Sequence, residues 1–260
     1  MSSERAIELH SMIIDGVDTW DDWNIVSVKK PVFSEPELKS TYIDIPGANG
    51  QLDLTEVLTG YPTFNNRTGT IQFFLYDDSM KALEKLNIIR NYLHGRKHKI
   101  VLNDEPDYYY EGRLVMRDSH PTKEGEYAAF DLEYNLAPYK YELKKRGLRN
   151  TLVYTDNLLE RKILRMRGAG MPVCPKFTVH SITVNDSTMD VHVIMQYDNT
   201  LYTLHNGTST YPQSFVFPQI IMTDNQYEFD VGLYMSAEGN PAIPSSVVVD
   251  FEIEYQGGWL

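Results

Sequence analysis

Apolar and polar residues alternate one by one along much of this chain, and this period of two constrains the fold more than any other feature. In residues 42–45 and again in 52–55, every second residue is apolar. Side chains of a β-strand point to opposite faces in turn, so such segments form strands with one apolar face. The residues between them, PGANG at 46–50, tolerate the backbone angles of tight turns. We therefore predict a β-hairpin over 42–55.

Further strands are expected from the same alternation over 69–76, 99–102, 108–117 and 127–136. One segment departs from it, because from about Ser79 the apolar residues recur at the spacing of a helix. Those residues are Leu83, Leu86, Ile89 and Leu93. We predict a first domain over 1–139 of the α+β class, an antiparallel β assembly with one helix.

A second domain is predicted over 168–260. It opens with GAGMPVCP, which holds two glycines and two prolines, and continues with short strand-like runs separated by polar turns. That spacing favours a β-sandwich. The whole protein is therefore expected to be mostly β.

Charge divides the chain in the same way. The net charge is −12, yet residues 140–167 hold nine Lys and Arg against three Asp and Glu, while the rest of the chain is acidic. We interpret 140–167 as a basic connector that pairs with acidic neighbours. An acidic body disfavours nucleic acid, whose binding depends on basic residues neutralising phosphates.

No catalytic motif is present in the sequence. It lacks the signatures of nucleophilic hydrolases, zinc proteases and nucleotide-binding loops. His94 and His98 are four residues apart, but Gly95 intervenes and no third metal ligand is local. Cys174 has no neighbouring histidine or basic residue, so a structural thiol is favoured over a nucleophile. We predict no enzyme activity, no cofactor and no metal.

Secretion and membrane insertion are not indicated by the sequence. The apolar run Met12–Ile14 is too short for a signal-peptide core, and the longest uncharged stretch, 199–223, is rich in Thr, Asn, Gln and Ser. A single cysteine allows no disulfide within the chain, which fits assembly in a reducing cytoplasm. No membrane partner is expected.

Three stretches resemble the distal tail proteins of siphophages, the bacteriophages with long non-contractile tails, and of related prophages. They are MIIDGVDTWDDWNI near the start, YIDIPGANGQLDLTEVLTGYPTFNNRTGTIQFFL, and VVVDFEIEYQGGWL at the end. The specific part lies in DIPG at 44–47, LDLT at 52–55 and RTG at 67–69. Over 168–260 the likeness is architectural only.

The resemblance implies a structural protein of the virion, assembled in the bacterial host cytoplasm. It implies a hexameric ring at the tail tip that joins the tail-tube protein to the baseplate or to an adhesion protein and lets DNA pass. The first domain would form the ring, and a galectin-like or carbohydrate-module-like sandwich would face outward. An acidic lumen would repel DNA, since six copies of a chain of charge −12 would carry −72.

The predicted hairpin would then be an arm that docks on a neighbouring subunit, using strands that an isolated protein would have to protect. The candidate interface residues are Tyr42, Ile43, Asp44, Ile45, Pro46, Gly47, Leu52, Asp53 and Leu54.

Two other functions remain open from the sequence. The second domain could be a carbohydrate-binding module or part of a lectin-like adhesin, with Tyr202, Tyr211 and Trp259 as candidates for stacking on sugars. Alternatively, these rings fill the core of the sandwich. A glycoside hydrolase that carries such a module is the weakest reading, because no site is visible in the sequence.

Overall fold

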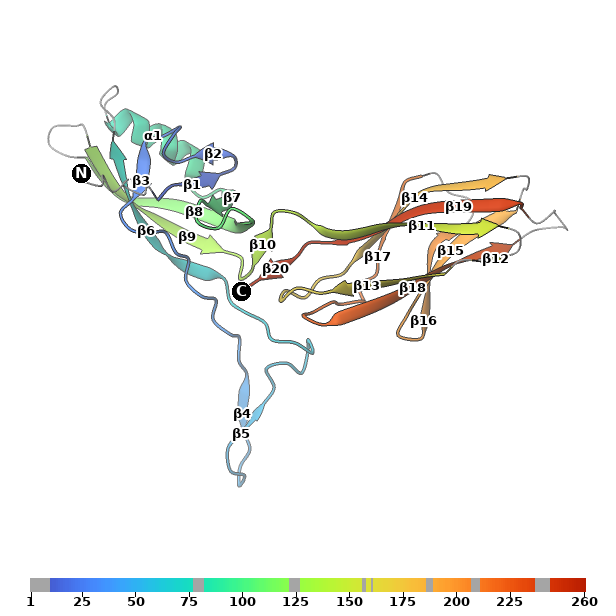
Figure 1. Cartoon of the computed structure of the whole chain (residues 1–260). Coiled ribbons are helices and arrows are strands. Elements are labelled where there is room, and N and C mark those ends of the chain that lie inside the picture. Colours follow the sequence, from blue (N-terminus) through green and yellow to red (C-terminus); the bar gives the residue numbers. More distant parts are fainter. Residues whose placement is uncertain are drawn as a thin grey trace, which may run out of the picture. The chain divides into compact units, whose positions relative to one another are not determined.

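The protein is described from a computed structural model of the whole chain. The structure describes residues 10–76, 82–121, 127–155, 158–159, 161–185, 189–206, 211–236 and 244–260. The chain forms two compact units, residues 1–143 with Leu260 and residues 144–259. Both consist mainly of β-strands, so the predicted fold class, mostly β with an α+β first domain, is confirmed (Figure 1).

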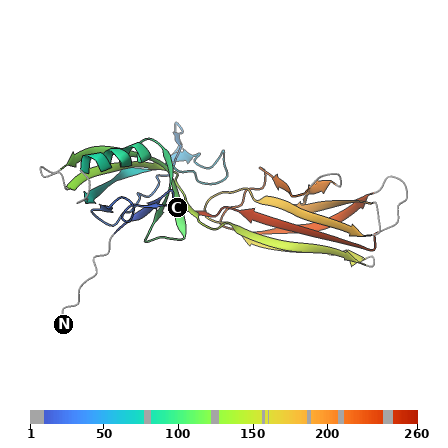
Figure 2. The ribbon, with the colours of Figure 1, turned by 90° about the horizontal axis from the view of Figure 1, so that it is seen from above.

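The first unit is built on an antiparallel sheet with the strand order β2-β1-β7-β8-β9-β6-β3, and β10 pairs with β8 beside this path. The strands are β1 (Met12–Ile14), β2 (Val17–Asp18), β3 (Ile25–Ser27), β6 (Arg67–Tyr76), β7 (Lys97–Leu102), β8 (Tyr108–Pro121), β9 (Tyr127–Leu136) and β10 (Lys140–Glu142). Helix α1 (Ala82–Leu93) lies on one face of this sheet (Figure 2).

Burial along the sheet follows the alternation in the sequence. On β6, Ile71, Phe73 and Leu75 are buried, whereas Gln72 and Phe74 between them are exposed. The buried positions face α1 and join one core with apolar residues of β7, β8 and β9. The opposite face of the sheet has no helix on it among the described residues.

Helix α1 is confirmed in kind, with one correction to its apolar face. Its buried residues are Ala82, Leu86, Ile89 and Leu93, a stripe at helical spacing. Leu83 was expected on that face but is 54% exposed, because it lies one position around the helix from Ala82. The predicted start near Ser79 lies outside the described residues.

A long excursion from the first unit, residues 37–65, is called the arm. At its end β4 (Tyr42–Asp44) and β5 (Gln51–Asp53) form a two-stranded sheet of their own. Nearer the sheet, Lys39 donates its N–H to the carbonyl of Thr63 at 2.9 Å, and Asn65 donates to Glu37 at 2.8 Å. The chain segments that leave and re-enter the unit are therefore hydrogen-bonded side by side at the base of the arm (Figure 1).

The second unit is a β-sandwich of two antiparallel sheets, ordered β12-β11-β19-β14-β17 and β13-β18-β15-β16. The strands are β11 (Arg146–Thr155), β12 (Leu158–Leu159), β13 (Lys162–Arg167), β14 (Lys176–Asn185), β15 (Asp190–Tyr197), β16 (Thr200–Asn206), β17 (Gln213–Val216), β18 (Gln226–Ser236) and β19 (Ser246–Tyr255), with β20 (Gly258–Trp259) near the end. The inward side chains of both sheets form one core.

The predicted domain boundaries need correction, because 140–167 is no connector. Strand β11 pairs with β19 along ten residues and β13 pairs with β18 along six, so the second unit begins at Lys144 and not at 168. Leu152 on β11 and Leu164 on β13 are buried in the core of the sandwich. Basic residues hid this alternation, since Arg149, Arg165 and Arg167 occupy outward positions beside the buried ones.

Candidate functional site: the arm and its base

The arm ends in a hairpin with two unlike faces. Ile43 lies directly across from Leu52, whereas Tyr42 lies across from Asp53 and Asp44 from Gln51. Because successive side chains alternate between faces, Ile43 and Leu52 share one face and the polar pairs share the other. The side-chain amide of Gln51 donates to Asp44 at 2.9 Å and ties the polar face together.

The tip of the hairpin is set by its turn residues. Ala48 donates its N–H to the carbonyl of Ile45 at 3.1 Å, which closes a four-residue turn. Pro46 and Gly47 occupy its centre, and Gly47 has a φ of 83°. Proline followed by a residue of positive φ is the pattern of a type II turn, which accepts few residues other than glycine at the second place.

Asp53 fixes the point where β5 ends. Its carboxylate accepts the N–H of Thr55 at 2.9 Å, and hydrogen bonding by Thr55 lowers the pKa of Asp53. Thr55 in turn accepts the N–H of Thr41 at 3.1 Å, and Leu54 donates to the carbonyl of Thr41 at 2.8 Å. The two strands are therefore joined by hydrogen bonds beyond their short ladder.

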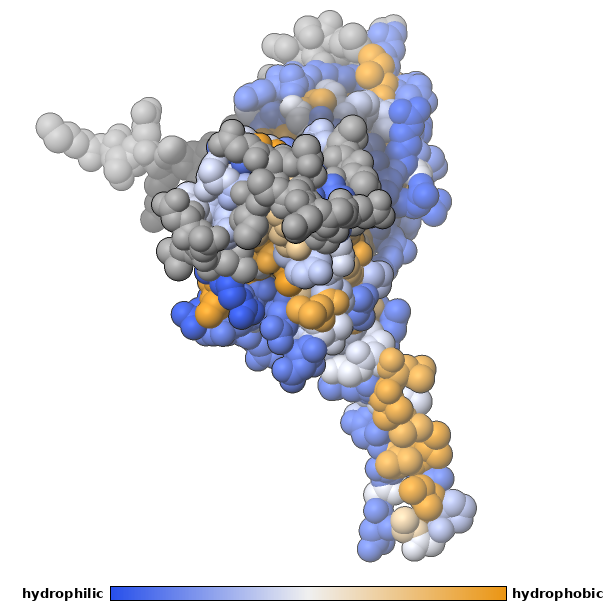
Figure 3. Space-filling model, turned by 90° about the vertical axis from the view of Figure 1, so that its right-hand side faces the viewer, coloured by the Kyte–Doolittle hydropathy of each residue, from blue (hydrophilic) through white to orange (hydrophobic). Residues whose placement is uncertain are grey.

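The apolar face of the arm is open to solvent. Ile43, Ile45 and Leu52 are each nearly half exposed, and Leu58 is 97% exposed. Figure 3 shows hydrophobic atoms along much of the arm. An isolated two-stranded hairpin is marginal in water, and burying its apolar side chains would gain about 25 cal/mol per Å². The arm therefore presents to solvent apolar side chains that its own hairpin does not cover.

Arg67 fastens the base of the arm to the sheet. Its guanidinium is almost fully buried and donates to the carbonyls of Pro138 and Ser34, both at 2.8 Å. It also lies 5.7 Å from the centre of the Tyr110 ring. Since Ser34 precedes the arm and Arg67 follows it, one side chain joins both ends of the excursion.

All nine predicted interface residues lie on the arm, in or next to its strands β4 and β5 and in the turn at its tip. Sequence reasoning missed Val57 and Leu58, which are 67% and 97% exposed just beyond β5. They follow each other without alternation, so the strand pattern did not reveal them. It also missed Arg67, whose contacts join residues far apart in the chain.

The three candidates for stacking on sugars are each engaged in packing. Tyr202 packs against the core, with its ring centre 4.8 Å from that of Phe217. Trp259 also packs against the core. Tyr211 accepts or donates a hydrogen bond at 3.0 Å with the buried His205. Each of the three rings therefore has a packing or hydrogen-bond partner within the second unit.

Metal and membrane features can be judged only for the residues that the structure describes. Among them no group of three or more His, Cys, Asp or Glu could hold a metal ion, and no helix is long and apolar enough to cross a membrane. His98 is buried and bonds to Asp15 at 2.7 Å and to the carbonyl of Leu93 at 3.0 Å. His94 is exposed, so the two histidines do not share a ligand position.

Five basic residues of 140–167 pair with acidic neighbours on the sandwich, in line with the sequence prediction; they are Lys145, Arg149, Arg161, Arg165 and Arg167. Arg165 pairs with Glu228 at 2.6 Å across β13 and β18, and Lys145 pairs with Glu254 at 3.3 Å. Arg149 pairs with Asp250 and lowers the pKa of that carboxyl by hydrogen bonding. These charges therefore have partners within the unit.

The fold itself has a counterpart among solved structures. The crystal structure of the SPP1 Dit protein, described as a paradigm of hub adsorption apparatus in phages that infect Gram-positive bacteria, matches with a TM-score of 0.58 and 15% identity. The match covers 97% of this chain and 100% of that one. No family model and no curated protein sequence matches the chain. At the level of the fold the resemblance to a siphophage distal tail protein is thus confirmed, and this chain has the fold of SPP1 Dit.

Proposed function

We propose that this protein is a structural hub of a bacteriophage tail tip, built as a ring of identical subunits. The observation that carries the proposal is the arm, a preformed hairpin whose apolar face is left open by its own chain. The likeness in fold to SPP1 Dit supports the setting in which such an arm would act.

The arm favours assembly from identical subunits for a physical reason. A side chain such as Leu58, 97% exposed, gains nothing from folding and gains burial only from contact with another molecule. When an arm on one surface docks on a different surface of the next copy, the contact is head to tail, and such contacts form a closed ring when the rotation between copies closes.

The finer parts of the proposal are these. Six copies form the ring, the tail-tube protein binds on one side, and a baseplate or adhesion protein binds on the other. The ring is assembled in the host cytoplasm, becomes part of the virion and lets DNA pass without binding it. The net charge of −12 per chain supports the last point, because an acidic ring repels phosphates. No catalysis is involved.

Mass in solution tests the proposal. Light scattering on the purified chain should give about 180 kDa, six times the 30.0 kDa of one chain, and negative-stain images should show rings. Cell-wall glycan binding by a particle of 30 kDa, with no ring at any concentration, would instead identify a monomeric lectin-like protein.

A further inference from the structure

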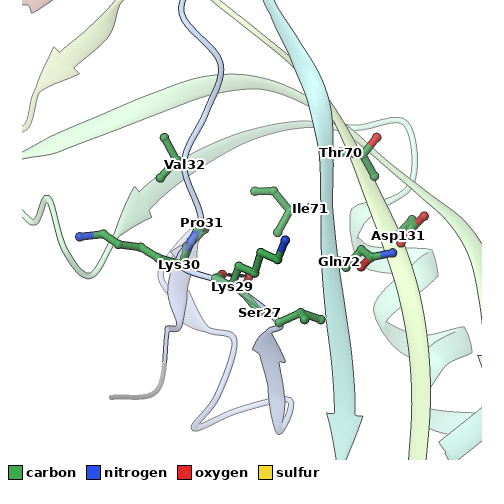
Figure 4. A pocket seen from close by; sticks show the side chains of 10 residues that line it. Ser27, Lys29, Lys30, Pro31, Val32, Thr70, Ile71, Gln72 and Asp131 are labelled. Carbon is green, nitrogen blue, oxygen red and sulfur yellow. Dashed lines mark hydrogen bonds between the residues drawn. The ribbon is translucent and has the colours of Figure 1, made fainter. Parts of the chain in front are cut away.

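We propose that the arm of one subunit docks in a groove beside the edge of strand β6 on the next subunit. This rests on the proposed ring and adds the receptor that the arm requires. The groove lies in the first unit, between β6 and the segment that follows β3 (Figure 4).

The groove is open and has a volume of about 490 Å³. One wall is formed by Val28, Lys29 and Val32, and Thr70 and Gln72 of β6 line the opposite side. In Figure 4 the side chain of Lys29 reaches from its wall toward β6. Val28 is 43% exposed and Val32 is 69% exposed, so this wall offers apolar surface to an occupant.

The edge of β6 is also unpaired at this groove. Strand β3 pairs with β6 only from Phe73 to Leu75. Beyond it, Val28 donates to the carbonyl of Gln72 at 3.0 Å and the Ser34 hydroxyl donates to that of Thr68 at 2.9 Å. Peptide groups of alternate residues point to the same side of a strand, so the backbone of Thr70 faces the groove between these bonds. No described strand lies there, and such an edge can take an extended segment of another chain.

Charge matches the arm to this groove. Between residues 41 and 60 the arm carries three acidic residues, Asp44, Asp53 and Glu56, and no Lys or Arg. The groove presents Lys29 and Lys30 on one wall against Asp131 on the far side. Lys30 is held by Asp104 at 3.5 Å, which leaves the exposed Lys29 as the cation nearest to an incoming arm.

The same charges disfavour the simplest alternative, two arms packing on each other. Such a two-fold contact between residues 41–60 of two arms would bring their three acids together without a base from either of these segments. The arm and the groove are different surfaces of one unit, so their contact is head to tail. It leaves each subunit with one arm and one groove to offer, as a closed ring requires.

Complementation between two disabled variants tests this contact. The groove variant Lys29→Glu/Val32→Asp keeps a normal arm, and the arm variant Ile45→Asp/Leu54→Asp keeps a normal groove. We expect each alone to be a monomer by light scattering. Mixed in equal amounts, they should form a heterodimer of about 60 kDa and stop there, because that pair has only a disabled arm and a disabled groove left to offer. Leu201 of the second unit is 66% exposed, close to the 69% of Val32, so Leu201→Asp is the matched control and should keep the mass of the unmodified protein.

A disulfide gives an independent readout for weak assemblies. In a Cys174→Ser background, Ile43→Cys with Val32→Cys should give a ladder of cross-linked chains on oxidation, whereas Ile43→Cys with Leu201→Cys should not. If the unmodified protein assembles and the groove variant keeps the assembled mass, the arm docks elsewhere and only this inference falls. If the unmodified protein stays a monomer and no ladder forms, self-assembly itself fails, and the ring with it.

Discussion

Strand β19 of the sandwich and the hairpin of the arm have the same alternating sequence pattern and opposite surroundings. On β19, Val249, Phe251 and Ile253 are buried to 1% exposure or less, because the facing sheet of the same chain covers them. On the arm, Ile43 and Leu52 remain nearly half exposed. A period of two therefore specifies a strand with an apolar face, and the rest of the chain decides whether that face is covered from within or left for a partner.

The largest effect is expected where the covering partner is another subunit. Replacing Ile45 and Leu54 with Asp should weaken the binding of each arm to the next subunit by about 4 kcal/mol, which is roughly a thousandfold in affinity. Central apolar residues of an interface contribute about 2 kcal/mol or more each. The protein should become a monomer while its melting temperature as a monomer stays unchanged. An unaltered mass would mean that the hairpin makes no contact between subunits, and loss of the fold would mean that the hairpin supports its own unit.

The matching change on the covered face should act on folding and not on assembly. Phe251→Ala removes a buried ring and should lower the stability of the second unit by about 3 to 5 kcal/mol, through lost transfer energy and a cavity. Calorimetry should show the lower transition, and light scattering below that transition should show the normal mass. If Phe251→Ala dissociated the assembly without lowering the stability of the second unit, the covered face of β19 would behave like the open face of the arm, and the comparison would fail.

Arg67 shares features with both the exposed arm and the covered strand, because it is buried within one subunit and its hydrogen bonds hold the base of the arm. Arg67→Gln should cost about 1.5 to 3 kcal/mol in the first unit, because charged hydrogen bonds to Pro138 and Ser34 are lost. Hydrogen exchange should increase at the base of the arm. Arg113→Gln, an exposed arginine of β8, is the control and should leave exchange at the arm base unchanged.

Local signals explain what could be predicted from the sequence. The hairpin follows from alternation and from Pro46 and Gly47 in the turn, and α1 follows from its apolar spacing, because each depends on neighbours in the chain. Contacts between distant residues leave no such signal. The bonds of Arg67 to Ser34 and Pro138 span 33 and 71 residues, and the groove at Thr70 exists only because β3 ends its pairing early.

Residues 140–167 show how one signal can hide another. Their positive charge suggested a connector, although every second residue of β11 and β13 near the core is apolar and buried. The prediction that the bases pair with acids was right, since that depends on composition, and the prediction of their fold was wrong, since it required knowing which strands lie beside them.

The smallest effect is expected at one of those surface pairs. Asp250→Asn removes the partner of Arg149 on the outward face of β19 and should cost less than about 1 kcal/mol at neutral pH. Hydrogen bonding by Arg149 lowers the pKa of Asp250 in the folded state from its usual 3.8. A carboxyl with a lowered folded pKa adds stability above its unfolded pKa, and that stability is lost as the pH falls through the folded value. Thermal unfolding should therefore separate the two proteins slightly at pH 7 and bring them together near pH 2. If the difference in stability between the two proteins grew in acid, the ionised carboxylate of Asp250 would be disfavoured by its surroundings. The pairing of Arg149 with Asp250 would then not stabilise the sheet.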